Sequence, residues 1–293
     1  MSLIRQIGYI ILATPEPEAS AADLSSIAGL RITKRDQQGI YLSSNARQCE
    51  VAYLHGSKAG VRAIGLEAVD ADAVKEIERR ARTEGIKILD DRPLLSGVEY
   101  AVRFATPMGP IFEVHTPIER RKAEPALMTA GRRVRRLEHV NLRVSDPKSF
   151  SELATKLLEM KLSDRTENYE RAWYRAADGF HHTFAAGPGS GIHHYAFDAY
   201  SVQNLVEVAD GLVARGRSLL WGLGRHGPGN NIFSYYRDPN GCVVEVSWGM
   251  ERIDCDLSHQ PGVWPFGDKS NVLDLWGSTP PAAYGSALTG FIE

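Results

Sequence analysis

One acidic residue interrupts an otherwise apolar run late in the sequence. Glu245 lies in the stretch 242–248, CVVEVSW, which has the alternation of a β-strand. A buried carboxylate is costly, so such an acid faces solvent, forms an ion pair or holds a cation. The strand alone allows the first interpretation, because alternation groups Glu245 with Val243 and Ser247 on a face that could be exposed. The rest of the chain must decide between these interpretations.

The chain contains two related copies of one sequence pattern. Three pairs of segments match at nearly one spacing, namely 106–114 with 238–246, 64–68 with 195–199, and 8–12 with 139–143. In the first pair both members read as a turn followed by an apolar strand that carries one acid. Three matches that keep one spacing over more than half a copy predict tandem copies of one module.

Only the second copy has histidines at the matched positions. It carries His139, His194 and Glu245 in three strand regions. The first copy has Gly8, Ala63 and Glu113 there. Glycine and alanine cannot supply a metal ligand, so a metal site can exist in the second copy alone. Two imidazoles and one carboxylate on one face form the facial triad typical of non-haem Fe(II) oxygenases, and a cation there would offset the cost of burying the glutamate.

Two histidine doublets leave the choice of side chain open. In His193-His194, strand alternation directs only one ring toward the site, and the repeat does not choose between them. The doublet His181-His182 poses the same question. Single histidines in apolar strands are more often core residues than ligands, so the metal hypothesis rests on the set rather than on any one ring.

A glycine-rich loop and the strand after it bring further polar groups beside the acid. The loop carries His226, and the strand carries Tyr235 and Tyr236. The turn at 238–241 lays this strand beside the one that bears Glu245. His226 and one of the two tyrosines can therefore reach whatever a metal binds.

Each copy reads as a strand, a helix and then several strands. Apolar spacing predicts helices over 73–85, 148–159 and 201–216. Strands are predicted at 39–44, 51–56, 171–176 and 181–187. Antiparallel strands with helices on one face predict an α+β fold. The tail from Met250 lacks periodicity, and we expect it to be irregular cover for the second module.

The bulk composition suits an enzyme that acts on small molecules. The 293 residues carry a formal net charge of -2, which gives no reason to expect nucleic acid or an anionic membrane as a partner. The apolar patch near the amino terminus is too short to span a membrane and lacks a signal-peptide cleavage site, so we expect a first strand and a cytoplasmic protein. Cys49, Cys242 and Cys255 lack CxxC spacing, which favours a reducing compartment without structural disulfides.

These residues resemble the type I extradiol ring-cleaving dioxygenases of the vicinal oxygen chelate superfamily, within the glyoxalase and bleomycin resistance group. The specific match runs through Gly224, His226, Tyr235, Asp238, Pro239, Gly241 and Glu245. Ser234 departs from the bulky residue usual before the tyrosine. The resemblance implies an α+β fold of tandem βαβββ modules, in which pairs of module halves form an incomplete, barrel-like mixed sheet around a site.

The resemblance also implies a division of the chain. A domain without metal would span 1–118, a linker 119–136, the catalytic metal-binding domain 137–250, and an irregular tail 251–293. Relatives in this family commonly form homo-oligomers, which we expect here too.

The resemblance further implies a role for each candidate residue. The metal ligands would be His139, His194 and Glu245, holding Fe(II) or, as in some members, Mn(II). His182 would line the oxygen-binding side, and His226 and Tyr235 would contact the catechol oxygens. The substrates would be O2 and a small aromatic diol, with substituted and biaryl 2,3-diols included, and the ring would open next to the diol.

Two other classes of function stay open on the sequence. Another metalloenzyme built on the same modules, such as an isomerase or a thiol transferase, needs no counterpart of His182, His226 and Tyr235. A non-catalytic protein that binds a small aromatic molecule has no use for a metal triad. Metal content would separate the second class from the enzymes.

Overall fold

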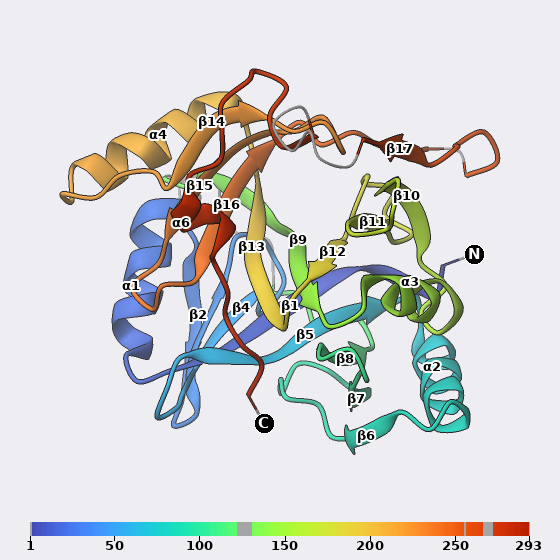
Figure 1. The fold of residues 1–293 in the computed structure, drawn as a ribbon. Coiled ribbons are helices and arrows are strands. Elements are labelled where there is room, and N and C mark those ends of the chain that lie inside the picture. The colour runs from blue at the N-terminus through green and yellow to red at the C-terminus, as the bar shows by residue number, and fades with distance from the viewer. Residues whose placement is uncertain (1, 122–130, 255, 266–271, 293) are drawn as a thin grey trace.

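Two mixed β-sheets make up most of the computed structural model, which describes residues 2–121, 131–254, 256–265 and 272–292 (Figure 1). The first sheet has the strand order β2-β3-β4-β1-β5-β8-β7-β6. Its strands are β1 (Ile4–Thr14), β2 (Arg31–Arg35), β3 (Gly39–Ser43), β4 (Val51–His55), β5 (Gly60–Ala68), β6 (Lys87–Asp90), β7 (Ala101–Ala105) and β8 (Ile111–His115).

The second sheet repeats this arrangement with one strand added. Its order is β14-β15-β16-β13-β9-β12-β11-β10-β17. Its strands are β9 (Val134–Val144), β10 (Lys161–Thr166), β11 (Ala172–Arg175), β12 (Phe184–Pro188), β13 (Gly191–Ala199), β14 (Trp221–Arg225), β15 (Ile232–Arg237), β16 (Val243–Trp248) and β17 (Gly262–Trp264). β17 belongs to the tail and pairs in parallel with β10, so the tail is less irregular than expected.

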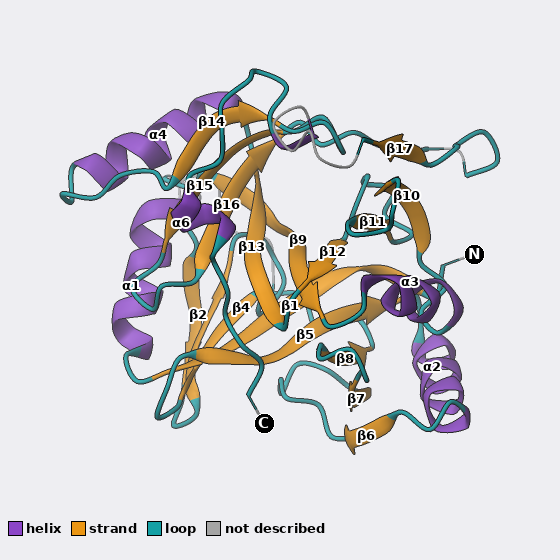
Figure 2. Ribbon diagram, viewed as in Figure 1, coloured by secondary structure: helices purple, strands orange, loops and turns teal. Residues whose placement is uncertain are grey.

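The long helices lie on the outside of the sheets (Figure 2). They are α1 (Pro17–Ala28), α2 (Ala71–Thr83), α3 (Pro147–Lys156) and α4 (Val202–Val213). The short α6 (Ala282–Gly285) belongs to the tail, and its Tyr284 lines a cavity of the second sheet. The start of α2 is fixed by Asp70, whose carboxylate accepts a hydrogen bond from the Ala73 N–H at 2.8 Å, and Asp146 caps α3 in the same way. The three helices predicted from apolar spacing are present, and α1 is an addition.

The repeating unit is half the size of the copy seen in the sequence. In each sheet, a strand, a helix and three further strands occur twice, as in β1-α1-β2-β3-β4 followed by β5-α2-β6-β7-β8. The expected α+β class with tandem βαβββ units and incomplete, barrel-like mixed sheets is confirmed. Each predicted module is a pair of such units, so the described chain holds four.

Alternate residues of each sheet enter different cores. On β1, Ile10 and Leu12 join the large apolar cluster that includes residues of both sheets and of all four long helices. Tyr9 and Ile11 point the other way, into a smaller cluster held by the first sheet alone. The concave face of each sheet therefore encloses a separate set of side chains. Among the described residues, only the second sheet has several histidines in this set.

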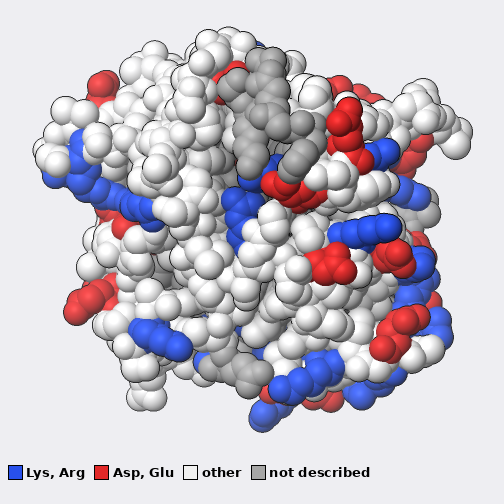
Figure 3. Space-filling model, viewed as in Figure 1, with Lys and Arg blue, Asp and Glu red and all other residues white. Residues whose placement is uncertain are grey.

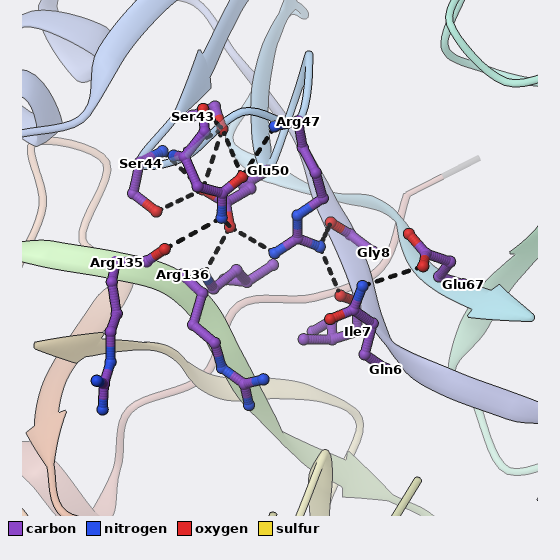
Figure 4. Close-up of polar contacts among 12 residues, drawn as sticks. Gln6, Ile7, Gly8, Ser43, Ser44, Arg47, Glu50, Glu67, Arg135 and Arg136 are labelled. Atoms are coloured by element: carbon purple, nitrogen blue, oxygen red, sulfur yellow. Dashed lines mark hydrogen bonds and ion pairs between the residues drawn. The ribbon is translucent and has the colours of Figure 1, made fainter. Parts of the chain in front are cut away.

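A buried ion pair ties the first sheet to the strand that carries His139 (Figure 4). Arg47 Nη2 lies 2.5 Å from Glu50 Oε1, and both side chains are almost fully buried. The same carboxylate oxygen accepts a hydrogen bond from the Leu137 N–H of β9 at 2.9 Å. Arg47 also donates to the carbonyl oxygens of Ile7 and Gly8 in β1. Every polar group of this link has a partner, as a buried charge requires.

The surface carries no gathering of charge of one sign on the face shown. In Figure 3, basic and acidic side chains are interspersed around a broad uncharged area. Within the described part of the chain, no helix is both long and apolar enough to cross a bilayer.

Some predictions fall at the edge of what the structure describes. Residues 122–130 of the predicted linker and Cys255 lie outside the described residues, and β9 begins at Val134, inside the predicted linker. The division into domains stays a prediction. Cys49 and Cys242 are buried free thiols.

Candidate active site

Three neighbouring strands bring the candidate ligands together. β13 lies between β9 and β16, and Ala196 pairs with His139 on one side and with Glu245 on the other. His194 precedes Ala196 by two residues on the same strand. Because strand residues two apart share a face, the three side chains point into the concave side of the second sheet. At most 2% of each residue is exposed.

The three side chains converge on one point. His139 Nε2 lies 3.3 Å from His194 Nε2, and Glu245 Oε2 lies 3.2 Å from the first of these atoms and 3.0 Å from the second. Metal–ligand bonds of about 2.1 Å that meet at right angles place ligand atoms about 3.0 Å apart. Glu245 Oε2 is buried and accepts no hydrogen bond. This donor set, with its unsatisfied oxygen, fits a divalent cation.

The outer nitrogen of His194 is held by the other histidine of its doublet. His193 Nε2 lies 2.8 Å from the Tyr284 carbonyl oxygen, which can only accept, so this nitrogen carries the proton. Burial lowers the pKa of His193 to about 2, so the ring is neutral and its Nδ1 is an acceptor. That acceptor lies 2.7 Å from His194 Nδ1, which must donate. The Nε2 lone pair of His194 is thereby directed into the site.

A carboxylate that the sequence analysis missed supports His139. Glu138 Oε2 lies 3.2 Å from His139 Nδ1 and also accepts a hydrogen bond from the Ser247 hydroxyl. A carboxylate at this nitrogen fixes the ring and leaves Nε2 free as a ligand. The signal was present in the sequence, because Glu138 is a second acid inside an apolar strand.

The doublet His181-His182 is built like the other one. His182 is buried, and its ring centroid lies 4.4 Å from that of His139. Its Nδ1 lies 3.0 Å from His181 Nδ1, and His181 Nε2 lies 3.3 Å from Asp164 Oδ2. Burial and the nearby His139 hold the pKa of His182 well below its usual value. The predicted strand at 181–187 was placed too early, because β12 begins at Phe184 and the doublet precedes it.

The structure chooses Tyr235 over Tyr236. Tyr235 pairs with Glu245 across β15 and β16, whereas Tyr236 points into the large shared core. The Tyr235 hydroxyl lies 2.7 Å from His226 Nε2, and His226 Nδ1 lies 2.6 Å from the Leu273 carbonyl oxygen. Since a carbonyl only accepts, Nδ1 carries a proton, which leaves Nε2 to share a hydrogen bond with the phenol.

The tail closes the site. A cavity of about 30 Å³, with room for one or two waters, remains between the side chains. It is lined by His139, Asn141, Arg171, Trp173, His182, His194, His226, Pro228, Tyr235, Glu245, Val272, Leu273 and Tyr284. The tail residues were missed because their segment has no periodicity. A ring-sized ligand must displace part of this lining.

The first sheet has a counterpart of this site, shifted by one residue from the sequence alignment. Tyr9 pairs with Gly65, which pairs with Glu113 on its other side. In the same way, His139 pairs with Ala196, which pairs with Glu245. The predicted match of Gly8 with His139 was therefore wrong by one position. The Tyr9 hydroxyl donates to Glu113, and Arg103 Nη1 lies 2.8 Å from that carboxylate. Ala63 supplies no ligand, as predicted.

Comparisons with known proteins agree with this geometry. Residues 136–246 match the family described as Glyoxalase/Bleomycin resistance protein/Dioxygenase superfamily. A manganese-dependent 2,3-dihydroxybiphenyl 1,2-dioxygenase from Geobacillus genomosp. 3 is 24% identical, over 89% of this chain and 90% of its own. Metapyrocatechase 2 from Cupriavidus necator is 30% identical over 151 residues, which are 50% of this chain and 46% of that protein.

A solved structure shares the fold. A variant of homoprotocatechuate 2,3-dioxygenase from B. fuscum superposes with a TM-score of 0.90 at 20% identity, covering 100% of this chain and 84% of the other. The expected resemblance is thus confirmed. Residues 136–246 form a domain of the Glyoxalase/Bleomycin resistance protein/Dioxygenase superfamily, and the chain is a homologue of extradiol dioxygenases.

Proposed function

We propose that this chain is a metal-dependent extradiol dioxygenase that opens a catechol-type ring next to its diol with O2. One observation carries the proposal. The nitrogens of His139 and His194 and one oxygen of Glu245 converge at 3.0 Å to 3.3 Å in a dry pocket. Three further side chains with proton-carrying groups, His182, His226 and Tyr235, line the same pocket.

The three converging residues would hold the metal. We propose Fe(II), with Mn(II) as the second choice because one full-length relative is named as manganese-dependent. When bound, the ion would supply Lewis acidity toward both diol oxygens and a coordination position for O2 beside them. The chain contributes the charge of one carboxylate and two neutral imidazoles, so a divalent cation keeps a net positive charge.

His226 and Tyr235 would act at the diol. In the neutral form of His226, Nε2 is the acceptor, because Nδ1 donates to the Leu273 carbonyl. It can take a proton from a substrate hydroxyl once the substrate displaces the Tyr235 phenol from it. Burial and the nearby Glu245 raise the pKa of Tyr235 well above its usual value, so the phenol keeps its proton and donates a hydrogen bond.

His182 would act on the oxygen side. Its Nδ1 is engaged with His181, so Nε2 is the ring atom free to face the site. A neutral imidazole in a buried pocket can take up the second proton of the diol, stabilise negative charge that develops on oxygen, and then return that proton. The isomerase and thiol transferase alternatives have no use for this residue together with His226 and Tyr235.

Oxygen uptake tests the proposal directly. Protein loaded with Fe(II) without air is mixed with a panel of catechols that includes 3-substituted and biaryl diols, while the visible spectrum is recorded. We expect a yellow ring-opened product with matching oxygen consumption, both lost in His194→Ala. A protein that retains one metal per chain but consumes no oxygen with any diol would favour the isomerase alternative. A protein that binds no metal would favour a non-catalytic role.

We also propose the setting of the protein. Buried free thiols at Cys49 and Cys242 support a reducing, cytoplasmic compartment. Family resemblance supports a homo-oligomer of chains divided near residues 118 and 137, without nucleic acid or membrane as partner. Light scattering coupled to gel filtration measures the oligomeric state.

A further inference from the structure

Two arginines next to the candidate active site lack an anionic partner among the described residues. Arg143 is 8% exposed, and its Nη1 is fully buried without a hydrogen bond. No described carboxylate forms an ion pair with Arg143 or with Arg171. Buried charges in proteins are almost always paired, because desolvation without compensation is costly. An unpaired buried guanidinium therefore points to an anionic partner beyond the described residues.

The two guanidinium groups meet over a glycine. Arg143 on β9 pairs in register with Gly187 on β12, and Arg171 lies immediately before the β11 residue that pairs with Ala186. A Cβ atom at Gly187 would stand 2.6 Å from Arg143 Nη1 and 3.7 Å from Arg171 Nη1. Any side chain at this position would clash with the Arg143 guanidinium. Glycine lets both guanidinium groups pack over this position.

Arg171 lines the same cavity as the candidate metal ligands, and the Arg143 guanidinium packs beside it. Strand alternation puts His139, Asn141 and Arg143 on one face of β9, and Arg171 and Asn141 line the metal-site cavity. Asn141 pairs with His194, so Arg143 lies one two-residue step, about 7 Å along the strand, beyond the level of that ligand. This spacing suits a ligand that reaches both ends across one aromatic ring.

The charge on this pair persists near neutral pH. Burial and repulsion from Arg171 lower the pKa of Arg143 to about 10, which still leaves the guanidinium protonated. The other groups that act on it are Glu170 and Tyr284, and burial raises the pKa of Tyr284 to about 12, so that phenol is neutral. Two adjacent positive charges are thus held together without an equal negative charge.

We propose that Arg143 and Arg171 form a subsite for a carboxylate, so that the preferred substrate is a catechol with a carboxylate on the side of the ring away from the diol. This inference rests on the proposed function for the diol end of the pocket. Guanidinium groups bind carboxylates through paired, charge-assisted hydrogen bonds. Trp173 and Ala185, which pair across β11 and β12 between the two ends, supply an apolar wall for the ring.

A matched substrate series tests the subsite. The Fe(II)-loaded protein is assayed with 4-(carboxymethyl)catechol, its neutral amide and the cationic 4-(2-aminoethyl)catechol. We expect kcat/KM to favour the acid over the amide by about 10- to 100-fold, mainly through KM, as charge-assisted hydrogen bonds imply. In Arg171→Gln this preference falls to near unity. Arg165→Gln is the control and should keep the preference, because the Arg165 guanidinium donates to the backbone carbonyls of Thr166 and Glu167 at the end of β10.

Ligand binding without a diol separates this inference from the proposed reaction. Calorimetry compares phenylacetate with phenylacetamide on wild type, Arg143→Gln and Arg171→Gln. Tighter binding of the acid that disappears in either variant supports the subsite, even if no catechol is opened and the proposed reaction fails. Equal kcat/KM for acid and amide, with equal binding of the two diol-free ligands, overturns the subsite and leaves the dioxygenase in place. If Arg143→Gln does not fold, the partly exposed Arg171 decides the question.

Discussion

The two sheets bury a glutamate at the same register position, and they satisfy it in different ways. In the second sheet, Glu245 faces two imidazoles and keeps one oxygen without a hydrogen bond. In the first sheet, Glu113 accepts hydrogen bonds from Tyr9 and from the Leu94 N–H and pairs with Arg103. Arg103 occupies the register position that Tyr235 has in the second sheet.

The difference shows how little separates a structural ion pair from a candidate metal centre. In the first sheet, the positive charge beside the glutamate belongs to the chain itself, because it is the Arg103 guanidinium on the neighbouring strand. The second sheet has a neutral phenol there and two histidines, a donor set that fits an exchangeable metal ion. The backbone is shared, and the chemistry depends on a few side chains placed on it.

The largest expected effect is loss of the metal. His194→Ala removes one of three ligands, so we expect a loss of bound metal and a fall in activity of more than about 100-fold, since losing a mere hydrogen-bond partner of a ligand costs about 10- to 100-fold. Glu113→Gln, at the equivalent place in the first sheet, should leave metal content unchanged. Elemental analysis after reconstitution measures both. If Glu113→Gln also lost metal, the proposed difference between the two glutamates would be wrong.

The next effect concerns the ion pair of the first sheet. Arg103→Met leaves the Glu113 carboxylate buried without its cation, so we expect the free energy of unfolding to fall by about 3–5 kcal/mol. The double variant Arg103→Met, Glu113→Gln removes both charges, keeps an acceptor for the Tyr9 hydroxyl and the Leu94 N–H, and should regain most of this loss. Urea denaturation at neutral pH provides the values. A single variant as stable as wild type would show that Glu113 needs no cation.

A third prediction concerns matching turns in the two sheets. Asp238 begins the turn before β16 in the second sheet, and Thr106 has the corresponding position before β8 in the first. Burial raises the pKa of Asp238 to about 7, against about 3.9 in an unfolded chain. The folded state therefore holds the proton more tightly, and stability falls as pH rises from about 4 to 7.

Asp238→Asn should lack this slope and gain about 2–4 kcal/mol relative to wild type by pH 8, with no gain near pH 4. The asparagine keeps the carbonyl oxygen that accepts from the Asn240 and Cys242 N–H groups. Urea midpoints of metal-free protein at pH 5 and pH 8 provide the comparison. Parallel curves for the two proteins would argue against a raised pKa.

The smallest expected effect concerns the hydrogen bond between His193 and the candidate ligand His194. His193→Phe removes the acceptor of the His194 Nδ1–H, so we expect metal affinity to fall by about 10- to 100-fold, or about 1.4–2.7 kcal/mol. His181→Phe removes the matching residue of the other doublet and should leave metal affinity unchanged, because His182 is not among the converging atoms. Competition with a chelator measures both. Equal losses in the two variants would point to general loosening of the pocket.

Alternation and internal repetition single out His139, Glu245 and the doublet His193-His194 on three strands. The structure brings His139, His194 and Glu245 together. Irregular backbone limits this reasoning. A register shift between Ile7 and Tyr9 moved the repeat alignment by one residue.

A second shift, between Ile192 and His194, undid simple alternation at the histidine doublet, so sequence alone could not choose the ring. Other gaps have different causes. Helix α1 was missed because small residues such as Ser20 and Ala21 form much of its buried face, which weakens the apolar spacing. Tyr284 and Leu273 contribute backbone carbonyls that accept hydrogen bonds from His193 and His226. These residues are far apart in the sequence, so no local pattern predicts the contacts.

The buried pair of Arg47 and Glu50 has a consequence for how such a chain can evolve. One copy of the duplication supplies the acceptor for a backbone N–H of the other, two residues from His139. A gene that encoded only the second copy would expose that amide and lose its anchor. The second copy is therefore not self-contained, because the copy that lacks both histidines supplies part of the frame around the candidate metal ligands.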